Sequence, residues 1–354
     1  MLDRQALLVG SLPFNNEKEA MGIALEVLNN TLLSLPDGEV GNRSDQYPNG
    51  NRSSWAVTAI DSCIADTEHW NVVKKGTLGE NGFPVDYDSF YKIRPKCSPE
   101  EIVHYLNFRY HDYFRKSYHI FQRLREQHGL KDLKFQVGIP TGLAISLFML
   151  ESDNVFLYYE AFNQRLAYEV NEFLNEAGED VIIQIEIPAE LGLVYDSPSQ
   201  YDFALTSIID LVKRIQEPVK VGIHECYGDL NHKAFTHPQS LDRMVDFTNK
   251  LIDVWPKTHE LTYIHFPLAI GHLPPTLNRH YYEPLKQIQL PDHTRFVAGI
   301  VHEECDLPEL HQILNIIETI RNHKVDVACS CGMGRRSPDV SMRLMKFMKQ
   351  LVEA

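Results

Sequence analysis

The sequence predicts an α/β protein that folds as a single (β/α)₈ barrel over residues 1–354. Two observations predict it: short apolar, β-branched segments alternate with helix-like segments, and eight such strand segments can be counted along the chain. Alternating strands and helices imply parallel strands with right-handed crossovers, and eight units imply a closed barrel. An open, doubly wound sheet is the alternative. No Gly-x-Gly-x-x-Gly motif follows the first strand, which weighs against a dinucleotide-binding fold.

The first predicted elements frame a long irregular segment. A strand over 6–12 is followed by a helix over 17–30 and a weaker strand over 31–36. Residues 37–98 are polar and Gly-rich, and they are too many for a simple connection. We therefore predict that they form a functional insertion over one end of the fold. A helix over 99–128 follows, because its Ser-Pro-Glu-Glu start is a helix N-terminal signal.

The rest of the chain alternates regularly between the two kinds of element. The strand segments are rich in Val and Ile, as buried parallel strands are. The remaining strands are predicted over 135–140, 181–188, 219–226, 261–267, 295–301 and 325–331. The remaining helices are predicted over 154–177, 199–216, 239–254, a Pro-interrupted stretch to 289, 307–323 and 338–352.

Composition excludes several classes of partner. The chain has 48 acidic and 34 basic residues and a net charge of −14, which repels phosphate backbones, so we expect no nucleic-acid partner. No apolar run approaches the roughly 18 residues of a membrane span, and the N-terminus lacks signal-peptide features. We expect a cytoplasmic protein without a membrane partner, and the sequence leaves a homo-oligomer open. Its six scattered cysteines favour metal or catalytic use over disulfides.

Polar residues gather where the predicted strands end. Active sites of (β/α)₈ barrels lie at the C-terminal strand ends. Polar groups inside apolar strands cost free energy unless they are paired or ligated, so their convergence on one rim predicts a functional site. The residues found there are Ser11, Glu39, Glu186, His224, Cys226, His265, His302, Cys329 and Cys331.

The pair His224 and Cys226 is the sharpest local feature. The two residues are two positions apart on a strand, so their side chains share one face and can hold zinc together. A third ligand would come from the end of the last strand, where Cys329 and Cys331 face the same way on an ideal strand. His265 is a further candidate. A single buried His or Cys is more often a core residue, but three or four N and S donors form the catalytic zinc pattern.

Three other titratable residues are candidates for chemistry. Glu186 lies in an apolar strand, where it either contacts a substrate or forms a structural ion pair. Glu39 lies in a loop, where a solvated carboxylate is the commoner explanation. His302 could act as a general acid or base, or as a hydrogen-bonded histidine of the rim.

These residues resemble, in order and along nearly the whole chain, the C-terminal barrel of cobalamin-independent methionine synthase. That family shares a superfamily with uroporphyrinogen decarboxylase. Single motifs such as Gly-Ser are weak, whereas His-x-Cys followed about 100 residues later by Cys-Gly is more specific. Val9–Pro13 resembles the family's I-G-S-F-P, Asp37–Glu39 its H-G-E, Thr141–Gly142 its T-G-P, Gln184–Ala189 its Q-I-D-E-P-A, His224–Cys226 its H-x-C and Ser330–Met333 its D-C-G-L.

The resemblance implies roles for the substrate-facing residues. Ser11 would hold the carboxylate of homocysteine, and Glu39 and Glu186 would hold its amino group. His302 falls near the family's catalytic histidine. The resemblance also implies that Cys331 is the third zinc ligand.

The chain departs from the family in two places. The family's remaining zinc ligand is a glutamate on the sixth strand, whereas His265 stands at the matching position here. This implies a His₂Cys₂ set, which is also good zinc chemistry. The family's pterin-stacking tryptophan is absent, and Phe148 and Met149 occupy that stretch.

The resemblance therefore implies a zinc-dependent S-methyltransferase of methionine biosynthesis. It would transfer a methyl or alkyl group to a thiol such as homocysteine, with 5-methyltetrahydrofolate or another compound as donor. Its partners would be a small-molecule thiol and the donor. The alternatives are a zinc-dependent hydrolase, a metal-free enzyme like uroporphyrinogen decarboxylase, and a non-catalytic zinc-binding protein.

Overall fold

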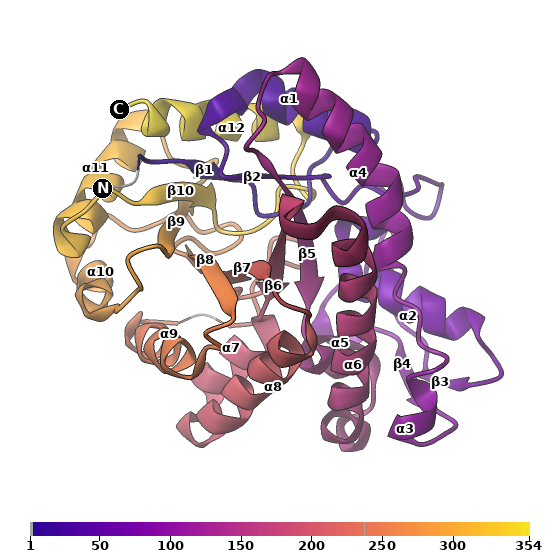
Figure 1. Ribbon diagram of the computed structural model, residues 1–354. Helices are drawn as coiled ribbons and strands as arrows, with labels where there is room; N and C mark the ends of the chain where they lie inside the picture. The colour runs from indigo at the N-terminus through magenta and orange to yellow at the C-terminus, as the bar shows by residue number, and fades with distance from the viewer. Residues whose placement is uncertain (1–2, 237) are drawn as a thin grey trace.

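Eight parallel strands form a nearly closed barrel with helices around it (Figure 1). The computed structural model describes residues 3–236 and 238–354. The strands follow one another in the order β1-β10-β9-β8-β7-β6-β5-β2, which confirms the predicted (β/α)₈ class. They are β1 (Ala6–Leu7), β2 (Ser34–Pro36), β5 (Lys134–Pro140), β6 (Val181–Glu186), β7 (Val219–His224), β8 (His259–Pro267), β9 (Arg295–Val301) and β10 (Asp326–Cys329).

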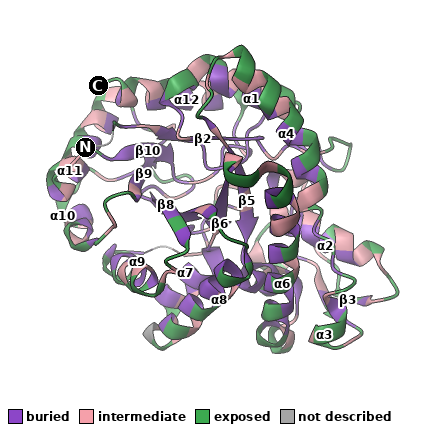
Figure 2. Cartoon of the chain, in the orientation of Figure 1, coloured by how far each residue is buried: buried purple, intermediate pink, exposed green. Residues whose placement is uncertain are grey.

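Helices cover the outside of the barrel, with their exposed residues turned away from the strands (Figure 2). Each long helix buries one apolar side, as expected of an amphipathic helix on a sheet. The long helices are α1 (Glu17–Leu28), α4 (Tyr110–Gln127), α6 (Ser152–Ala177), α8 (Tyr201–Arg214), α9 (Asp242–Val254), α11 (Leu307–Arg321) and α12 (Pro338–Val352). The shorter ones are α2 (Trp55–Ala65), α3 (Pro99–Ile102), α5 (Gly142–Met149), α7 (Pro188–Asp196) and α10 (Arg279–Tyr282).

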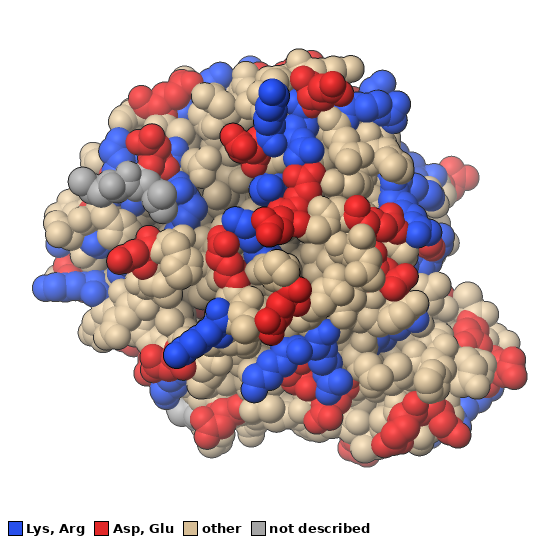
Figure 3. All heavy atoms as spheres, in the orientation of Figure 1, with Lys and Arg blue, Asp and Glu red and all other residues tan. Residues whose placement is uncertain are grey.

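Acidic and basic side chains are interspersed on the face shown in Figure 3. Some form ion pairs within one helix, such as Lys250 with Asp246 at 3.1 Å. Exposed pairs of this kind contribute little stability because water screens them. No helix within the described ranges has the length and apolar character needed to cross a membrane.

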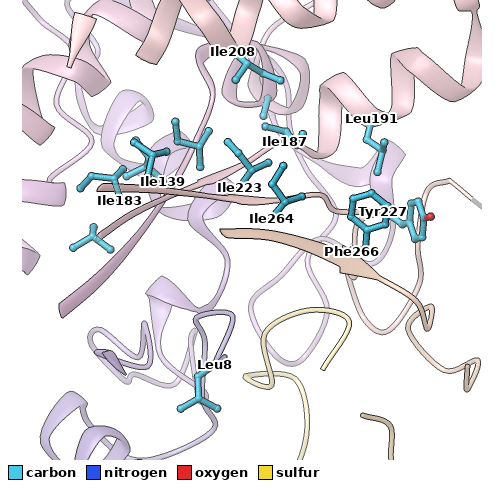
Figure 4. Close-up of a cluster of buried hydrophobic side chains, with 14 of the residues drawn as sticks. Leu8, Ile139, Ile183, Ile187, Leu191, Ile208, Ile223, Tyr227, Ile264 and Phe266 are labelled. Atoms are coloured by element: carbon cyan, nitrogen blue, oxygen red, sulfur yellow. The ribbon is translucent and has the colours of Figure 1, made fainter. Parts of the chain in front are cut away.

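Isoleucines of three neighbouring strands form part of the core outside the barrel. Ile183 on β6, Ile223 on β7 and Ile264 on β8 are fully buried and pack in one cluster with Ile208 of α8 (Figure 4). Successive side chains of a strand point to opposite faces, so Ile182, which precedes Ile183 on β6, lies in a separate cluster inside the barrel. Each buried side chain of this size stabilises the fold by about 1.5–3 kcal/mol.

The helix predicted over 99–128 is in fact two helices. α3 ends at Ile102 and α4 begins only at Tyr110. The buried carboxylate of Glu169, on α6, accepts hydrogen bonds from the backbone N–H groups of Phe108 and Tyr110 at 2.8 and 2.7 Å. A carboxylate that binds free N–H groups favours a helix start, so the prediction of one helix is wrong because of a contact made across the fold.

Four predicted strands end earlier than expected, and short helices begin beyond β5 and β6. β1 ends at Leu7, β6 at Glu186, β7 at His224 and β10 at Cys329. Pro188 is the first residue of α7, a position that suits proline because its missing N–H would be unpaired there. α5 starts after Thr141, whose side chain caps it. Sequence analysis missed both helices, because mostly buried helices lack a clear apolar stripe.

Residues 37–98 contain more regular structure than the sequence predicts. Besides α2, the segment forms β3 (Trp70–Lys74) and β4 (Lys92–Pro95), which pair in an antiparallel manner outside the barrel (Figure 1). A bridge between Ile93 and Leu150 and an ion pair between Arg94 and Glu151 attach β4 to the turn before α6. The segment is therefore anchored to the barrel.

Side-chain amides complete the hydrogen bonding at the seam between β1 and β2. A bridge joins Ala6 of β1 to Leu32, two residues before β2, and the N–H of Leu12 donates to the carbonyl oxygen of Gly38 at 2.8 Å beyond the two strands. Beyond the end of β1, the carbonyl oxygen of Val9 accepts hydrogen bonds from Gln136 Nε2 at 3.0 Å and from Gln184 Nε2 at 2.6 Å. Gln136 Nε2 also donates to the carbonyl oxygen of the preceding residue at 2.9 Å. Buried carbonyls need such partners, so two glutamines hold the chain that leads into the site.

The buried carboxyl group of Glu190 makes folding stability depend on pH. Glu190, on α7, has no exposed surface and accepts hydrogen bonds from the hydroxyls of Thr141 at 2.6 Å and Ser207 at 2.8 Å. Burial raises the pKa of Glu190 from 4.5 to about 7, and the two hydroxyls offset this only in part. Between these two values the folded protein keeps a proton that the unfolded chain has lost. The contribution of Glu190 to stability is therefore complete below pH 4.5 and is lost as pH rises to about 7.

Glu190→Gln should remove this pH dependence. We expect the variant to match the wild type near pH 5, and to exceed its stability at pH 8 by up to about 3 kcal/mol, since one pKa unit corresponds to about 1.4 kcal/mol. Urea unfolding at both pH values measures the difference. The same change at the exposed residue Glu179 serves as the control. A difference that is the same at both pH values would contradict the role given to Glu190.

Candidate metal centre and active site

Five of the predicted site residues line one cavity. The cavity lies where strands β6, β7 and β10 end, as expected for a barrel enzyme. Part of its wall comes from the segment after β2, through residues 53–56 and 83–90. The five predicted residues are Ser11, Glu39, Glu186, Cys226 and Cys331.

A histidine and two cysteines converge at this cavity. His224 ends β7, Cys226 follows two residues later, and Cys331 lies just beyond β10. One donor atom from each lies within 4.8 Å of the others. The Nε2 atom of His224 is buried and has no hydrogen-bond partner among the residues that the structure describes. A buried, unpaired nitrogen beside two sulfur atoms fits a zinc ion, which prefers N and S donors.

His265 lies behind His224 instead of joining the three donors. Its Nε2 is 2.9 Å from the carbonyl oxygen of Cys329, which can only accept, so this nitrogen carries the proton. Burial holds the pKa of His265 well below 6.5, so the ring is neutral and its Nδ1 accepts. That Nδ1 lies 2.7 Å from His224 Nδ1, which must then donate. The lone pair of His224 is thereby placed on Nε2, the atom that faces the sulfurs. The expected His₂Cys₂ set becomes three donors with a supporting histidine.

His265→Phe should weaken zinc binding without changing the ligands. Loss of a group that orients a metal-binding histidine costs about 10–100-fold in metal affinity. We expect that loss in a competition titration with a chelator, with the same N and S shell in X-ray absorption spectra. His259→Phe, at the other end of β8, is the control and should bind zinc normally. Disappearance of one nitrogen from the metal shell would show instead that His265 is a ligand.

The structure separates the two cysteines at the last strand. The pairing of β10 with β9 shifts register between Ala328 and Cys329, and β10 ends there. Cys329 is 1% exposed and packs in the core outside the barrel, whereas Cys331 lines the cavity. On an ideal strand the two cysteine side chains would lie on one face. The register shift and the strand end explain why they differ.

The two sulfur atoms of the cavity are electrostatically unequal. A hydrogen bond from the Cys226 thiol lowers the pKa of Cys331 well below 9.0, and the same bond, together with burial, raises the pKa of Cys226. Arg335 also lies near, with a guanidinium nitrogen 3.4 Å from Cys331 Sγ. Cys331 is therefore the thiol that ionises first, and a thiolate is the form that binds metals.

Two carboxylates line the same cavity as the cysteines, and one of them, Glu186, is the strand partner of His224. Glu186 accepts hydrogen bonds from the Trp55 indole at 3.1 Å and the Gln184 amide at 3.3 Å. Among the described residues it forms no ion pair with a lysine or arginine, which was one of the two roles that the sequence left open. Glu39 has a φ of 49°, in the left-handed region that non-glycine residues rarely occupy. A β-carbon built on Gly138 would lie 2.9 Å from Glu39 Oε1 and 3.2 Å from Glu186 Oε1, so the two carboxylates share one space.

The carboxylate pair is poised to receive a cation. Burial raises the pKa of Glu39 well above 4.5, and repulsion by Glu186 raises it further. Burial likewise raises the pKa of Glu186. Two carboxylates that disfavour each other's charge are relieved by a positive group between them.

Ser11 packs against the turn that carries Cys331. Its hydroxyl oxygen accepts a hydrogen bond from the N–H of Gly334 at 3.3 Å, and its carbonyl oxygen accepts one from Met333 at 2.7 Å. A β-carbon on Gly332 would lie 2.3 Å from Ser11 Oγ, so only glycine allows this approach. The hydroxyl proton of Ser11 is left to donate toward the cavity.

His302 does not line the cavity with these residues. It is fully buried, its Nε2 lies 2.8 Å from the carbonyl oxygen of Gly271, and its Nδ1 accepts a hydrogen bond from the N–H of Glu304 at 3.1 Å. Both ring nitrogens thus bind the backbone. This corresponds to the hydrogen-bonded rim histidine that the sequence left open.

Sequence reasoning missed the ion pair of Arg335 with Asp229. Two guanidinium nitrogens of Arg335 donate to one Asp229 oxygen at 3.0 and 2.8 Å, and both residues line the cavity. Arg335 stands four positions after Cys331, and Asp229 three positions after Cys226. Their positions just beyond two ligand candidates were the available signal.

The fold and the donors define a (β/α)₈ barrel with a histidine–dicysteine site at the C-terminal strand ends. No protein-family model matches the sequence, and no curated protein matches it. The chain is similar to a solved structure of a B12-independent methionine synthase from Shewanella sp. W3-18-1 in complex with selenomethionine. The identity is 14%, the TM-score is 0.61, and the match covers 99% of this chain and 97% of that one. A candidate vitamin-B12-independent methionine synthase from Listeria monocytogenes is 12% identical, with 95% and 86% covered and a TM-score of 0.49. The Shewanella likeness shows a shared fold.

Proposed function

We propose that this protein is a zinc-dependent enzyme that transfers a methyl group to the thiol of homocysteine or a closely related amino acid. One observation carries the proposal: the His224, Cys226 and Cys331 donors share a cavity edge with the carboxylates of Glu39 and Glu186. A metal site for sulfur and an anionic site for an amino group are what an aminothiol requires. The fold shared with the Shewanella methionine synthase is consistent with this use.

The three donors would hold the zinc ion and leave a fourth position open toward the cavity. Three protein ligands and one exchangeable position are the pattern of catalytic zinc. When bound, zinc supplies a positive charge that lowers the pKa of a thiol beside it. Through the hydrogen bond between the two rings, His265 keeps the Nε2 lone pair of His224 directed at the place where the zinc ion would bind.

The remaining groups would orient the amino acid. Glu39 and Glu186 would accept hydrogen bonds from its ammonium group, and Ser11 would donate to its carboxylate. The Shewanella synthase was solved with selenomethionine, an amino acid of the same shape as the expected product. With the acceptor held at both ends, its sulfur attacks the methyl carbon of the donor. The sulfur–carbon bond forms as the bond from that carbon to the donor breaks, and the electron pair leaves with the donor.

Calorimetry with matched ligands tests this proposal. Zinc-loaded protein should bind L-homocysteine more tightly than L-homoserine, which has a hydroxyl in place of the thiol. Glu186→Gln should weaken homocysteine binding by about 10–100-fold, because it removes a charged hydrogen-bond acceptor. The same substitution should leave binding of 4-mercaptobutyrate, which lacks the amino group, nearly unchanged.

Three outcomes would contradict the proposal. Equal binding of homocysteine and homoserine would show that the thiol is not recognised. An equal effect of Glu186→Gln on homocysteine and 4-mercaptobutyrate would remove the amino-group role. Turnover without any thiol would favour zinc-dependent hydrolysis.

A further inference from the structure

Aromatic side chains form a large part of the cavity lining. They come from three separate parts of the chain: the segment after β2, α5, and the loop after β7. No part of the proposed acceptor site explains them, because that site uses the strand ends. The aromatic residues that line the cavity are Trp55, Phe83, Tyr87, Phe90, Phe148 and Phe235.

Several of these rings meet at steep angles. Tyr87 and Phe235 are 5.3 Å apart at 82°, Trp55 and Phe148 are 5.5 Å apart at 71°, and Phe148 and Phe235 are 6.5 Å apart at 68°. Rings at these angles and distances contact one another edge to face, so together they form one aromatic surface of the cavity. We call the four residues Trp55, Tyr87, Phe148 and Phe235 the aromatic box.

The box does not suit a flat heterocycle. A flat ring held between two aromatic faces needs them parallel and about 7 Å apart, twice the optimal carbon contact distance. The pair nearest to parallel within the box, Tyr87 and Phe148, is tilted by 34° with centroids 6.1 Å apart. A ligand therefore lies against the box on its cavity side and not between two of its rings.

The polar atoms of the box are already bonded to the protein. The Tyr87 hydroxyl donates to the carbonyl oxygen of Lys233 at 2.8 Å and accepts from the N–H of Leu230 at 3.0 Å. The Trp55 indole N–H donates to Glu186. The two phenylalanines have no polar atoms. What the box offers a ligand is therefore aromatic faces, whose electron density attracts cations.

The charges around the box also favour a cation. Glu39 and Glu186 line the same cavity, and Glu186 is hydrogen-bonded to a member of the box. The guanidinium group of Arg335 is engaged by Asp229 through two hydrogen bonds. An apolar, positively charged group is one whose charge is carried by methylated nitrogen or sulfur, and aromatic side chains recognise such groups.

We propose that the methyl donor is a methyl onium cation, either a methylsulfonium or a quaternary methylammonium compound, held in the aromatic box. This assignment rests on the proposed thiol methylation. The acceptor's sulfur attacks one methyl carbon, the carbon–sulfonium or carbon–ammonium bond breaks, and its electron pair neutralises the departing sulfide or amine. The acceptor releases its thiol proton, so charge and atoms balance without an oxidant or reductant.

Equilibrium binding without thiol or turnover is the first test. Choline and trimethylsulfonium are the cationic probes, and 3,3-dimethylbutan-1-ol is the uncharged molecule with the shape of choline. We expect choline to bind about tenfold more tightly than the uncharged analogue, the size of a desolvated cation–π contribution. Equal binding of the two would show that the box is merely apolar and would overturn the assignment.

Phe148→Leu and Phe235→Leu test the rings while keeping apolar side chains in place. Each should weaken binding of the cationic probes by about fivefold and leave the uncharged analogue little changed. Phe156→Leu, at an exposed residue of α6, is the matched control and should bind like the wild type. Thermal unfolding of each variant shows whether weaker binding comes from the changed ring or from an unfolded protein. A folded Phe148→Leu protein with unchanged affinity for both cations would contradict the proposal.

Product analysis then identifies the donor. Zinc-loaded protein is incubated with homocysteine and either dimethylsulfoniopropionate, glycine betaine or 5-methyltetrahydrofolate, and S-methyl product is measured by mass spectrometry. Product from either onium compound supports the proposal and distinguishes the two sources. Product from the folate alone overturns it. If zinc and homocysteine bind but no cation binds, only the donor assignment fails; if cations bind but homocysteine does not, the proposed function fails.

Discussion

Cys331→Ser should lose both the zinc ion and the methyl-transfer activity. The side chain lies in the cavity with His224 and Cys226, and its sulfur is the one that ionises first. A hydroxyl is a far weaker zinc ligand than a thiolate, and even loss of a supporting group costs about 10–100-fold in affinity. We therefore expect more than about a 100-fold loss of zinc affinity. Elemental analysis of protein purified without added metal, with about one zinc per chain expected in the wild type, measures it.

Cys329→Ala is the matched control for this prediction. Cys329 stands two positions away and is buried, but it packs outside the barrel. Its carbonyl oxygen, which accepts the hydrogen bond from His265, is unaffected by the change. The control should keep its zinc even if its melting temperature falls. Wild-type protein that binds no zinc after reconstitution would leave the fold intact and refute the metal site.

Asp37→Ala should destabilise the protein by about 3–5 kcal/mol, the cost of leaving a buried charge without its partner. The Asp37 carboxylate is 2.7 Å from Arg52 and accepts a hydrogen bond from Ser117 at 2.6 Å. Burial alone would raise the pKa of Asp37, but Arg52 and the hydrogen bonds to Asp37 outweigh it and lower the pKa. The stabilising contribution is therefore present above about pH 4 and is lost as pH falls below it. Urea unfolding at pH 7 measures the loss.

The double variant Asp37→Ala/Arg52→Met tests the cause of that loss. Replacing the arginine, which then keeps only the longer contact with Glu17 at 3.6 Å, with an apolar side chain should recover part of the stability, because it removes a poorly paired buried charge. Asp112→Ala, which breaks the exposed pair with Arg109, should cost less than about 1 kcal/mol. If the double variant loses as much free energy of unfolding as Asp37→Ala and Arg52→Met lose when added together, the ion pair is not the source of the effect.

The barrel could be predicted because its signals are local. Strand segments rich in Val and Ile, helix starts and turn residues are all visible along the chain. The errors arose where a distant residue decides the outcome. The contact that separates α3 from α4 joins Phe108 to Glu169, which lies 61 positions further along the chain. No local sequence pattern shows that contact. α5 and α7 were missed because helices buried on most sides look like continued apolar strands.

The site could be predicted in part. Ser11, Glu39, Glu186, Cys226 and Cys331 lie at strand ends, where the barrel itself brings residues together, and all five line the cavity. Side-chain direction could not be predicted, because it depends on register shifts and on hydrogen bonds between strands.

That limit explains the two histidines that do not face the cavity. His265 turns toward His224 and the carbonyl oxygen of Cys329, and His302 binds the backbone at Gly271. The aromatic box was also hidden, since its residues come from segments with no pattern that links them.

The seam between β1 and β2 lies beside the proposed amino-acid site. Ser11 follows β1 and Glu39 follows β2, and next to them the N–H of Leu12 donates to the carbonyl oxygen of Gly38 at 2.8 Å. The bridge between Ala6 and Leu32 and the two glutamine amides complete the contacts at this seam. The contacts that close the barrel therefore also set the spacing between two groups of the proposed amino-acid site.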